Sequence, residues 1–145
     1  MLHDPAGEFA VDVREGERVE TRGVDARFRV EEDVVSVQRH TLSRFDSERP
    51  LEELAEVLTR RHAAELDGAP LVWTVCEWAG RAARCARGHA EVDGVRFERR
   101  GVLWREADRV TWLDVSTRRP GDAVERRFDE LREGWRWLSQ AEERS

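Results

Sequence analysis

The sequence lacks lysine, isoleucine, asparagine and tyrosine altogether, and it has two cysteines and one methionine among 145 residues. All 25 basic residues are therefore arginines, a bias that a GC-rich genome explains better than selection at any one site. Two cysteines are too few for a disulfide framework. We therefore expect Cys76 and Cys85 to be thiols that pack as small hydrophobic side chains.

Long apolar runs are also missing, and none approaches the roughly 20 residues that a membrane-spanning helix needs. The opening residues 1–5 have no basic start, no apolar stretch and no cysteine for a lipid, so no export signal is visible. These absences predict a cytoplasmic protein that does not insert into a membrane.

No basic block is present, because acids and arginines alternate along the chain and the net charge is -6. The summed field of such a chain repels a phosphate backbone, so nucleic acid is not an expected partner. The chain also lacks a glycine-rich phosphate loop and a Gly-x-Ser-x-Gly sequence. Its length suits one domain, residues 1–145, and its apolar residues recur periodically, as in folded proteins.

The first half of the chain predicts short strands followed by a helix. A helix from about Pro50 to Leu66 has an apolar stripe that includes His62, and Asp67 with Gly68 ends it. The predicted strands are Phe9 to Val13, Val19 to Thr21, Arg27 to Val30 and Val34 to His40.

A four-strand antiparallel meander is predicted next, over Leu71 to Trp78, Arg81 to Val92, Val95 to Glu106 and Arg109 to Thr117. Asp93-Gly94 favours a tight hairpin turn, which aligns Val92 with Val95 and His89 with Glu98. The apolar residues then change parity, which predicts a β-bulge at Gly101.

The two faces of this meander differ in the prediction. Val102, Trp104, Leu113 and Val115 face inward, and Trp104 opposes Thr111. Leu103, Val110 and Trp112 form a strip on the outer face, where the pattern predicts water.

A final helix begins at Asp122, whose capping box is completed by Glu125. Trp137 falls off its apolar stripe, so we expect it to be exposed. The stripe consists of Val124, Phe128, Leu131, Trp135 and Leu138.

Four local features accompany this order of elements: Phe9-Ala10-Val11 at the start, the Leu-Glu-Glu-Leu-Ala-Glu helix, Trp78-Ala79-Gly80 and the closing Arg127-Phe128-Asp129-Glu130-Leu131. With them, the chain over about residues 8–138 resembles the PsbP-like fold, and especially its bacterial DcrB-like branch. It implies an α+β fold, with an antiparallel sheet and helices packed on it, and a binding or adaptor role. Eag-type chaperones of this branch hold transmembrane segments of type VI secretion effectors.

Candidate catalytic and metal sites are weak. The spacing of Cys76, Cys85 and His89 matches no structural zinc pattern, and a Cys-His nucleophile would need a third orienting group. His40 and His62 are candidates for lining a pocket. We therefore expect no cofactor and no metal.

The sequence thus predicts a non-enzymatic, cytosolic binding or adaptor protein that holds an apolar protein segment, as a chaperone does. Leu103, Val110, Trp112 and Trp137 are its predicted partner-binding residues, and Trp112→Asp should remove the partner without unfolding the chain. One alternative is a small-molecule binder or enzyme with a pocket between the sheet and the first helix. The other is a homo-oligomeric structural protein, such as a homodimer.

Overall fold

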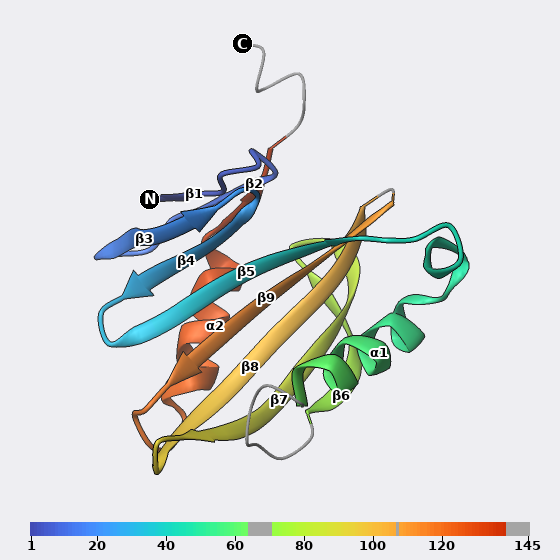
Figure 1. Cartoon of the computed structure of the whole chain (residues 1–145). Helices are drawn as coiled ribbons and strands as arrows, with labels where there is room; N and C mark the ends of the chain where they lie inside the picture. The colour runs from blue at the N-terminus through green and yellow to red at the C-terminus, as the bar shows by residue number, and fades with distance from the viewer. Residues whose placement is uncertain (64–70, 107, 139–145) are drawn as a thin grey trace.

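The computed structural model describes residues 1–63, 71–106 and 108–138, with the side chains of residues 61–63 left aside. Its elements follow the predicted order, with strands first, a helix, a meander and a second helix (Figure 1). They are β1 (Leu2–His3), β2 (Phe9–Val11), β3 (Gly16–Arg22), β4 (Asp25–Val30), β5 (Asp33–Thr41), the 3-10 helix η1 (Asp46–Glu48), α1 (Leu51–Ala63), β6 (Val72–Trp78), β7 (Arg81–Val92), β8 (Val95–Glu106), β9 (Arg109–Thr117), α2 (Ala123–Glu133) and β10 (Trp135–Trp137).

The main sheet has seven strands in the order β3-β4-β5-β9-β8-β7-β6. Every neighbouring pair is antiparallel, and the meander β6 to β9 forms as predicted. β5 joins the N-terminal strands to the meander by pairing with β9. The sheet therefore has β3 at one edge and β6 at the other.

The hairpin at Asp93-Gly94 has the predicted register, with Val92 opposite Val95 and His89 opposite Glu98. Both turn residues have positive φ, at 52° and 77°, which this dipeptide tolerates. The opposition of Trp104 and Thr111 is also confirmed.

The predicted β-bulge at Gly101 is wrong, because both ladders of β8 run without a shift past this residue. The parity change has another cause: both faces of the sheet are covered, so apolar residues point both ways. Gly101 instead gives room to a neighbour, since a Cβ there would lie 3.0 Å from the indole nitrogen of Trp112.

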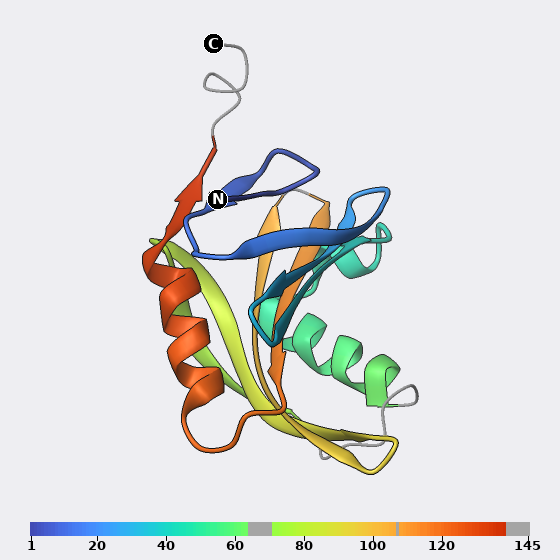
Figure 2. The same ribbon diagram turned by 90° about the vertical axis from the view of Figure 1, so that its left-hand side faces the viewer.

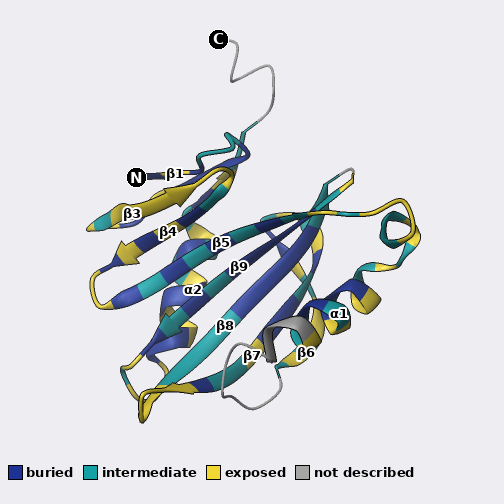
Figure 3. Ribbon diagram, in the orientation of Figure 1, coloured by how far each residue is buried: buried dark blue, intermediate teal, exposed yellow. Residues whose placement is uncertain are grey.

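One face of the sheet is covered by α2 and by a small sheet in which β2 lies between β1 and β10. The predicted inward residues of the meander belong to this larger core, together with Phe128 and Leu131 of α2. α1 lies on the opposite face (Figure 2). Runs of four consecutive buried residues accordingly occur on both central strands, at 101–104 of β8 and 110–113 of β9, where alternation would bury every second residue (Figure 3).

The end of the last helix differs from the prediction. α2 stops at Glu133, and Trp135 continues as strand β10, which pairs with β2. The cause is close backbone contact, because the Asp12 N–H donates to the Gly134 carbonyl at 2.9 Å and a Cβ at Gly134 would collide with Asp12. Trp135 is still buried, but in the small sheet rather than on a helix.

The start of α2 is also corrected in detail. Asp122 occupies the N-cap position, as predicted, yet its side chain makes no capping hydrogen bond. Its carboxylate pairs instead with Arg126 at 3.3 Å. The predicted capping box is therefore wrong.

Candidate functional site

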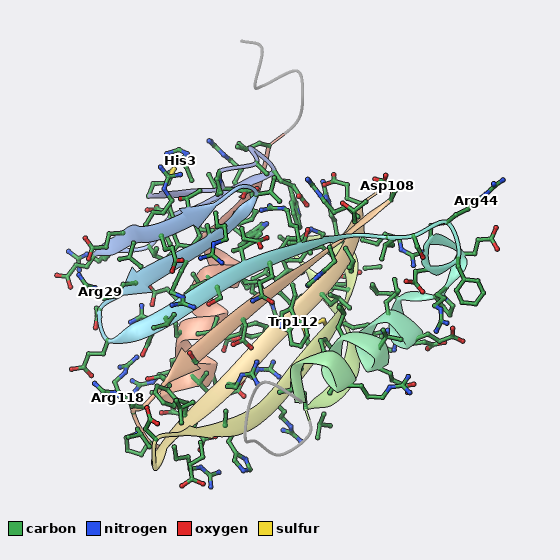
Figure 4. All side chains as sticks on the ribbon, in the orientation of Figure 1. His3, Arg29, Arg44, Asp108, Trp112 and Arg118 are labelled. Carbon is green, nitrogen blue, oxygen red and sulfur yellow. A yellow bond between two sulfur atoms is a disulfide. The ribbon has the colours of Figure 1, made fainter. Side chains whose placement is uncertain are left out.

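The predicted partner strip is not on the surface. Leu103, Val110 and Trp112 are 0%, 0% and 2% exposed, and they form a second core with Ala55 and Leu58 of α1. Figure 4 shows Trp112 on the sheet face that α1 covers. The predicted exposure is wrong because the helix lies across this face. A partner would reach the strip only if α1 moved aside, so we place the candidate site elsewhere.

Trp137, the fourth predicted contact, is half-buried in β10 rather than projecting from a helix. Its indole nitrogen donates to the Ala79 carbonyl at 2.9 Å, and the Arg81 guanidinium lies 3.8 Å from its ring centroid. Its ring also contacts Trp104 edge to face, at 5.3 Å. Through these contacts Trp137 holds β10 against the turn between β6 and β7.

A cleft of about 620 Å³ opens where α1 meets the β6 edge of the sheet. Its apolar floor comes from Trp73, whose indole nitrogen donates to Thr59 of α1 at 2.6 Å. Arg84 of β7 pairs with Glu52 of α1 at 3.0 Å at its rim. The lining residues are Glu52, Glu56, Thr59, Arg60, Leu71, Trp73 and Arg84.

Strand β6 beside this cleft has an unusual edge. Val72 and Val75 are 54% and 74% exposed, and Glu77 is the one charged residue of the strand. Edge strands are ordinarily protected by charge, and β3 at the other edge follows that rule with two glutamates and two arginines among its seven residues. These valines were not among the predicted partner-binding residues. The sequence did carry a signal for them, because the first strand of a predicted meander pairs with only one other strand of that meander.

The histidines do not converge on the cleft. His40 lies half-buried on β5 opposite Val110, on the α1 side of the sheet but outside the cleft lining. The His62 side chain lies outside the described residues. His89 lines a separate recess of about 400 Å³ with Glu98 and Val124.

The two cysteines are disulfide-bonded, with Cα atoms 5.8 Å apart, so the predicted thiols are wrong. Cys76 lies on β6 and Cys85 on β7, on the face that carries the larger core. Among residues 1–63, 71–106 and 108–138, no three His, Cys, Asp or Glu side chains group as metal ligands.

A buried ionic cluster joins the N-terminal hairpin to the main sheet. The Arg39 guanidinium lies 2.5 Å from Asp4, and both side chains are 0% exposed. Glu8 accepts from the Trp104 indole at 2.6 Å and lies 3.4 Å from both Arg39 and Arg109. Burial raises the pKa of Glu8, and the nearby carboxyl of Glu106 adds to the effect.

A second cluster fixes α2 to the start of β5. Asp33 is fully buried and accepts from Arg119 at 2.6 Å and from Arg127 at 2.7 Å. Burial alone would raise the pKa of Asp33, but the hydrogen bonds from Arg119, Arg127 and Thr117 hold it below its usual range. Both clusters are enclosed by arginines and are best explained as structural.

Solved structures share this arrangement of sheet and helices. The cyanobacterial PsbP protein (CyanoP) of Synechocystis sp. PCC 6803 superimposes with a TM-score of 0.65, at 12% identity, over 94% of this chain and 91% of that chain. The chain has a PsbP-like fold. A second PsbP-like match, LpqN of Mycobacterium tuberculosis, described as involved in cell envelope biogenesis, has a TM-score of 0.57 at 11% identity over 95% and 89% of the two chains.

The comparisons confirm the predicted PsbP-like α+β fold, and they do not identify a function. No protein-family model and no curated protein matches the sequence. The descriptions of the two structures name no catalytic activity. Within the described residues, no helix is both long and apolar enough to cross a membrane. Because a PsbP-like fold hosts different functions, the function has to be argued from the residues of this chain.

Proposed function

We propose that this PsbP-like chain is a non-enzymatic binding protein that takes an extended, uncharged segment of a partner protein along strand β6. The observation that carries the proposal is the contrast between the two edges of one sheet. β3 exposes one valine, Val19, among four charged residues, whereas β6 exposes Val72 and Val75 with a single charged residue, beside the cleft between α1 and the sheet edge.

Strand addition suits such an edge physically. Among the described strands β6 pairs with β7 alone, so no described strand occupies the other side of its backbone. Backbone hydrogen bonds then supply affinity, and pockets for alternate side chains supply specificity. The uncharged surface at Val72, Thr74 and Val75 is complementary to an uncharged, apolar segment.

The cleft offers the place for the alternate side chains. Trp73 and Val75 share the α1 face of β6, so every second residue of an added strand would face the cleft. Its volume of about 620 Å³ lies within the range of ordinary ligand sites. An apolar side chain of the partner would rest on the Trp73 ring.

The buried acids support a role without catalysis. Glu8 and Asp33 have shifted pKa values, yet their side chains are 5% and 0% exposed and are held by arginines. Structural ion pairs shift pKa values in the same manner as catalytic sites do. Neither residue lines the cleft.

The test is selection of random seven-residue peptides displayed on phage against the immobilised chain. We expect enriched peptides with alternating β-branched residues, which protect the β6 amides from hydrogen exchange. Val75→Glu should weaken binding at least about tenfold, equivalent to about 1.4 kcal/mol. The matched control is Val19→Glu, since Val19 is a 49% exposed valine on the opposite edge strand.

Other results would reject the proposal. The absence of enrichment, or equal binding by the Val75→Glu and Val19→Glu variants, would show that β6 is not the docking edge. A dimer that forms with rising concentration of the wild type, and that Val75→Glu makes monomeric, would show that β6 pairs with a second copy of the chain.

The cleft itself supports a second candidate, a small-molecule binder. Trp73 fluorescence would then respond to a ligand that leaves the β6 amides unprotected. The cleft lining combines apolar Leu71 and Trp73 with Arg84 and Glu52, as small-molecule sites do.

A further inference from the structure

The disulfide joins β6, the strand of the proposed docking edge, to its neighbour β7. Cys76 opposes Ala83 and Cys85 opposes Thr74, so the two cysteines are diagonal neighbours on one face of the β6–β7 pair. The bond closes a short loop, with a sequence separation of 9. It is a second covalent link between the edge strand and its neighbour, in addition to the backbone turn at Ala79 and Gly80.

The two sulfur atoms lie in different surroundings. Cys85 is 2% exposed and belongs to the larger core, whereas Cys76 is partly exposed at the edge strand. Cys76 packs against the same core from the edge strand and is the more accessible residue of the two.

Arg132 of α2 lies beside the buried sulfur. Its Nη2 is 3.8 Å from the Cys85 Sγ. The guanidinium is held over the rings of Trp78 and Phe128, at 5.1 and 5.3 Å from their centroids. Among the residues that the structure describes, no ion pair involves Arg132.

We propose that Cys76–Cys85 is a thiol-exchange site in which Cys76 receives the attack of an external dithiol and Cys85 leaves as a thiolate that Arg132 stabilises. Exchange proceeds through a mixed disulfide, and its rate rises as the leaving thiolate is stabilised. A cation beside a sulfur favours its thiolate form. Exposure and charge thus give the two cysteines different roles.

The exchange balances in atoms and electrons. The incoming thiolate forms a bond to Cys76 Sγ, and the electron pair of the broken Cys76–Cys85 bond goes to Cys85 Sγ. The second thiolate of the dithiol then attacks the first sulfur of the same dithiol, which is bonded to Cys76 Sγ. This attack closes the disulfide of the dithiol and releases the Cys76 thiolate. The protein gains two electrons and two protons in total, and the dithiol becomes a disulfide. The site does not depend on the proposed peptide binding.

The first test uses glutathione as a single-thiol probe on the folded, oxidised chain, followed by acid quenching and mass spectrometry. Trypsin separates the two cysteines, because Arg81 and Arg84 lie between them. We expect glutathione on the Cys76 peptide and a free thiol at Cys85. Glutathione on Cys85, or reaction only at the rate of global unfolding, would overturn the proposal.

The second test measures the rate of reduction by dithiothreitol. Arg132→Met should slow it about threefold for each unit by which the pKa of the Cys85 thiol rises, taking a Brønsted coefficient near 0.5. Arg132→Lys should restore most of the rate, which a packing role alone would not require. Arg126→Met is the control, since Arg126 lies on the same helix and pairs with Asp122. Equal rates for the wild type and Arg132→Met would refute the role of Arg132.

Discussion

Reducing the disulfide should lower the free energy of unfolding by an amount that follows from the length of its loop. Crosslinking two residues removes loop-closure entropy from the unfolded chain, by about 2.1 + 1.5R ln n cal/mol/K. With the sequence separation of 9 between Cys76 and Cys85, this gives about 2.6 kcal/mol at 25 °C. The reduced chain keeps both cores, so it should stay folded.

The assay is urea unfolding of the same chain with and without a phosphine reductant. For a typical slope of about 1–3 kcal/mol/M, the urea midpoint should fall by about 0.9–2.6 M on reduction. The Cys76→Ala, Cys85→Ala double variant is the control, and its midpoint should not respond to the reductant. A difference below about 1 kcal/mol in the wild type would refute the reasoning, because the loop would then not constrain the unfolded chain.

Three further predictions concern buried side chains. Trp112→Asp places a charge in the second core, where Trp112 is 2% exposed. It should lower the free energy of unfolding by more than about 4 kcal/mol and abolish the folded circular dichroism signal. If Leu103, Val110 and Trp112 were exposed instead, the variant would stay folded. Asp33→Asn removes one carboxylate from Arg127, which keeps Glu130 at 2.8 Å, so it should cost about 1.5–3 kcal/mol in urea unfolding at pH 7. Because the pKa of Asp33 is lowered, its contribution is present above its usual pKa and lost as the pH falls through the folded value, so the difference between variant and wild type should shrink in acid. The raised pKa of Glu8 makes the wild type lose stability as the pH rises from the usual glutamate range through the folded value, and Glu8→Gln should flatten that slope; an unchanged slope would assign it to another group.

The meander was predictable because its signals are local. Asp93-Gly94 selects one hairpin turn, and the pairing of Val92 with Val95 then sets the whole β7–β8 ladder. The opposition of Trp104 and Thr111 follows from the next short turn in the same manner. Such pairs need no knowledge of what covers the sheet.

The location of the candidate site was not predictable in the same manner, because burial depends on elements far away in the sequence. Alternation along β9 separates two faces but does not say which of them meets water. α1 was predicted as a helix with an apolar stripe, yet the sequence pattern does not place Ala55 and Leu58 on Trp112. The wrong prediction of a β-bulge at Gly101 has the same cause, because it assumed that only one face of the sheet is buried.

The closing tryptophans show how one pattern serves two structures. Trp135 and Leu138 continue the helical spacing of Phe128 and Leu131, but Trp135 and Trp137 also alternate as a strand does. Gly134 was the local signal for the end of the helix. Its contact with Asp12 decides between the two readings, and that contact joins opposite ends of the chain.

The disulfide was within reach of sequence reasoning. Ala79 and Gly80 both have positive φ, as a two-residue hairpin turn between Trp78 and Arg81 requires. Pairing Trp78 with Arg81 places Cys76 opposite Ala83, two residues from Cys85 and on the same face. Diagonal neighbours lie about 7–8 Å apart on average, just beyond the range of a bridge, and here the two Cα atoms are 5.8 Å apart, within it. The prediction of thiols rested instead on the expected reducing compartment, so the geometry of the hairpin should outweigh a compartment inferred from absent signals.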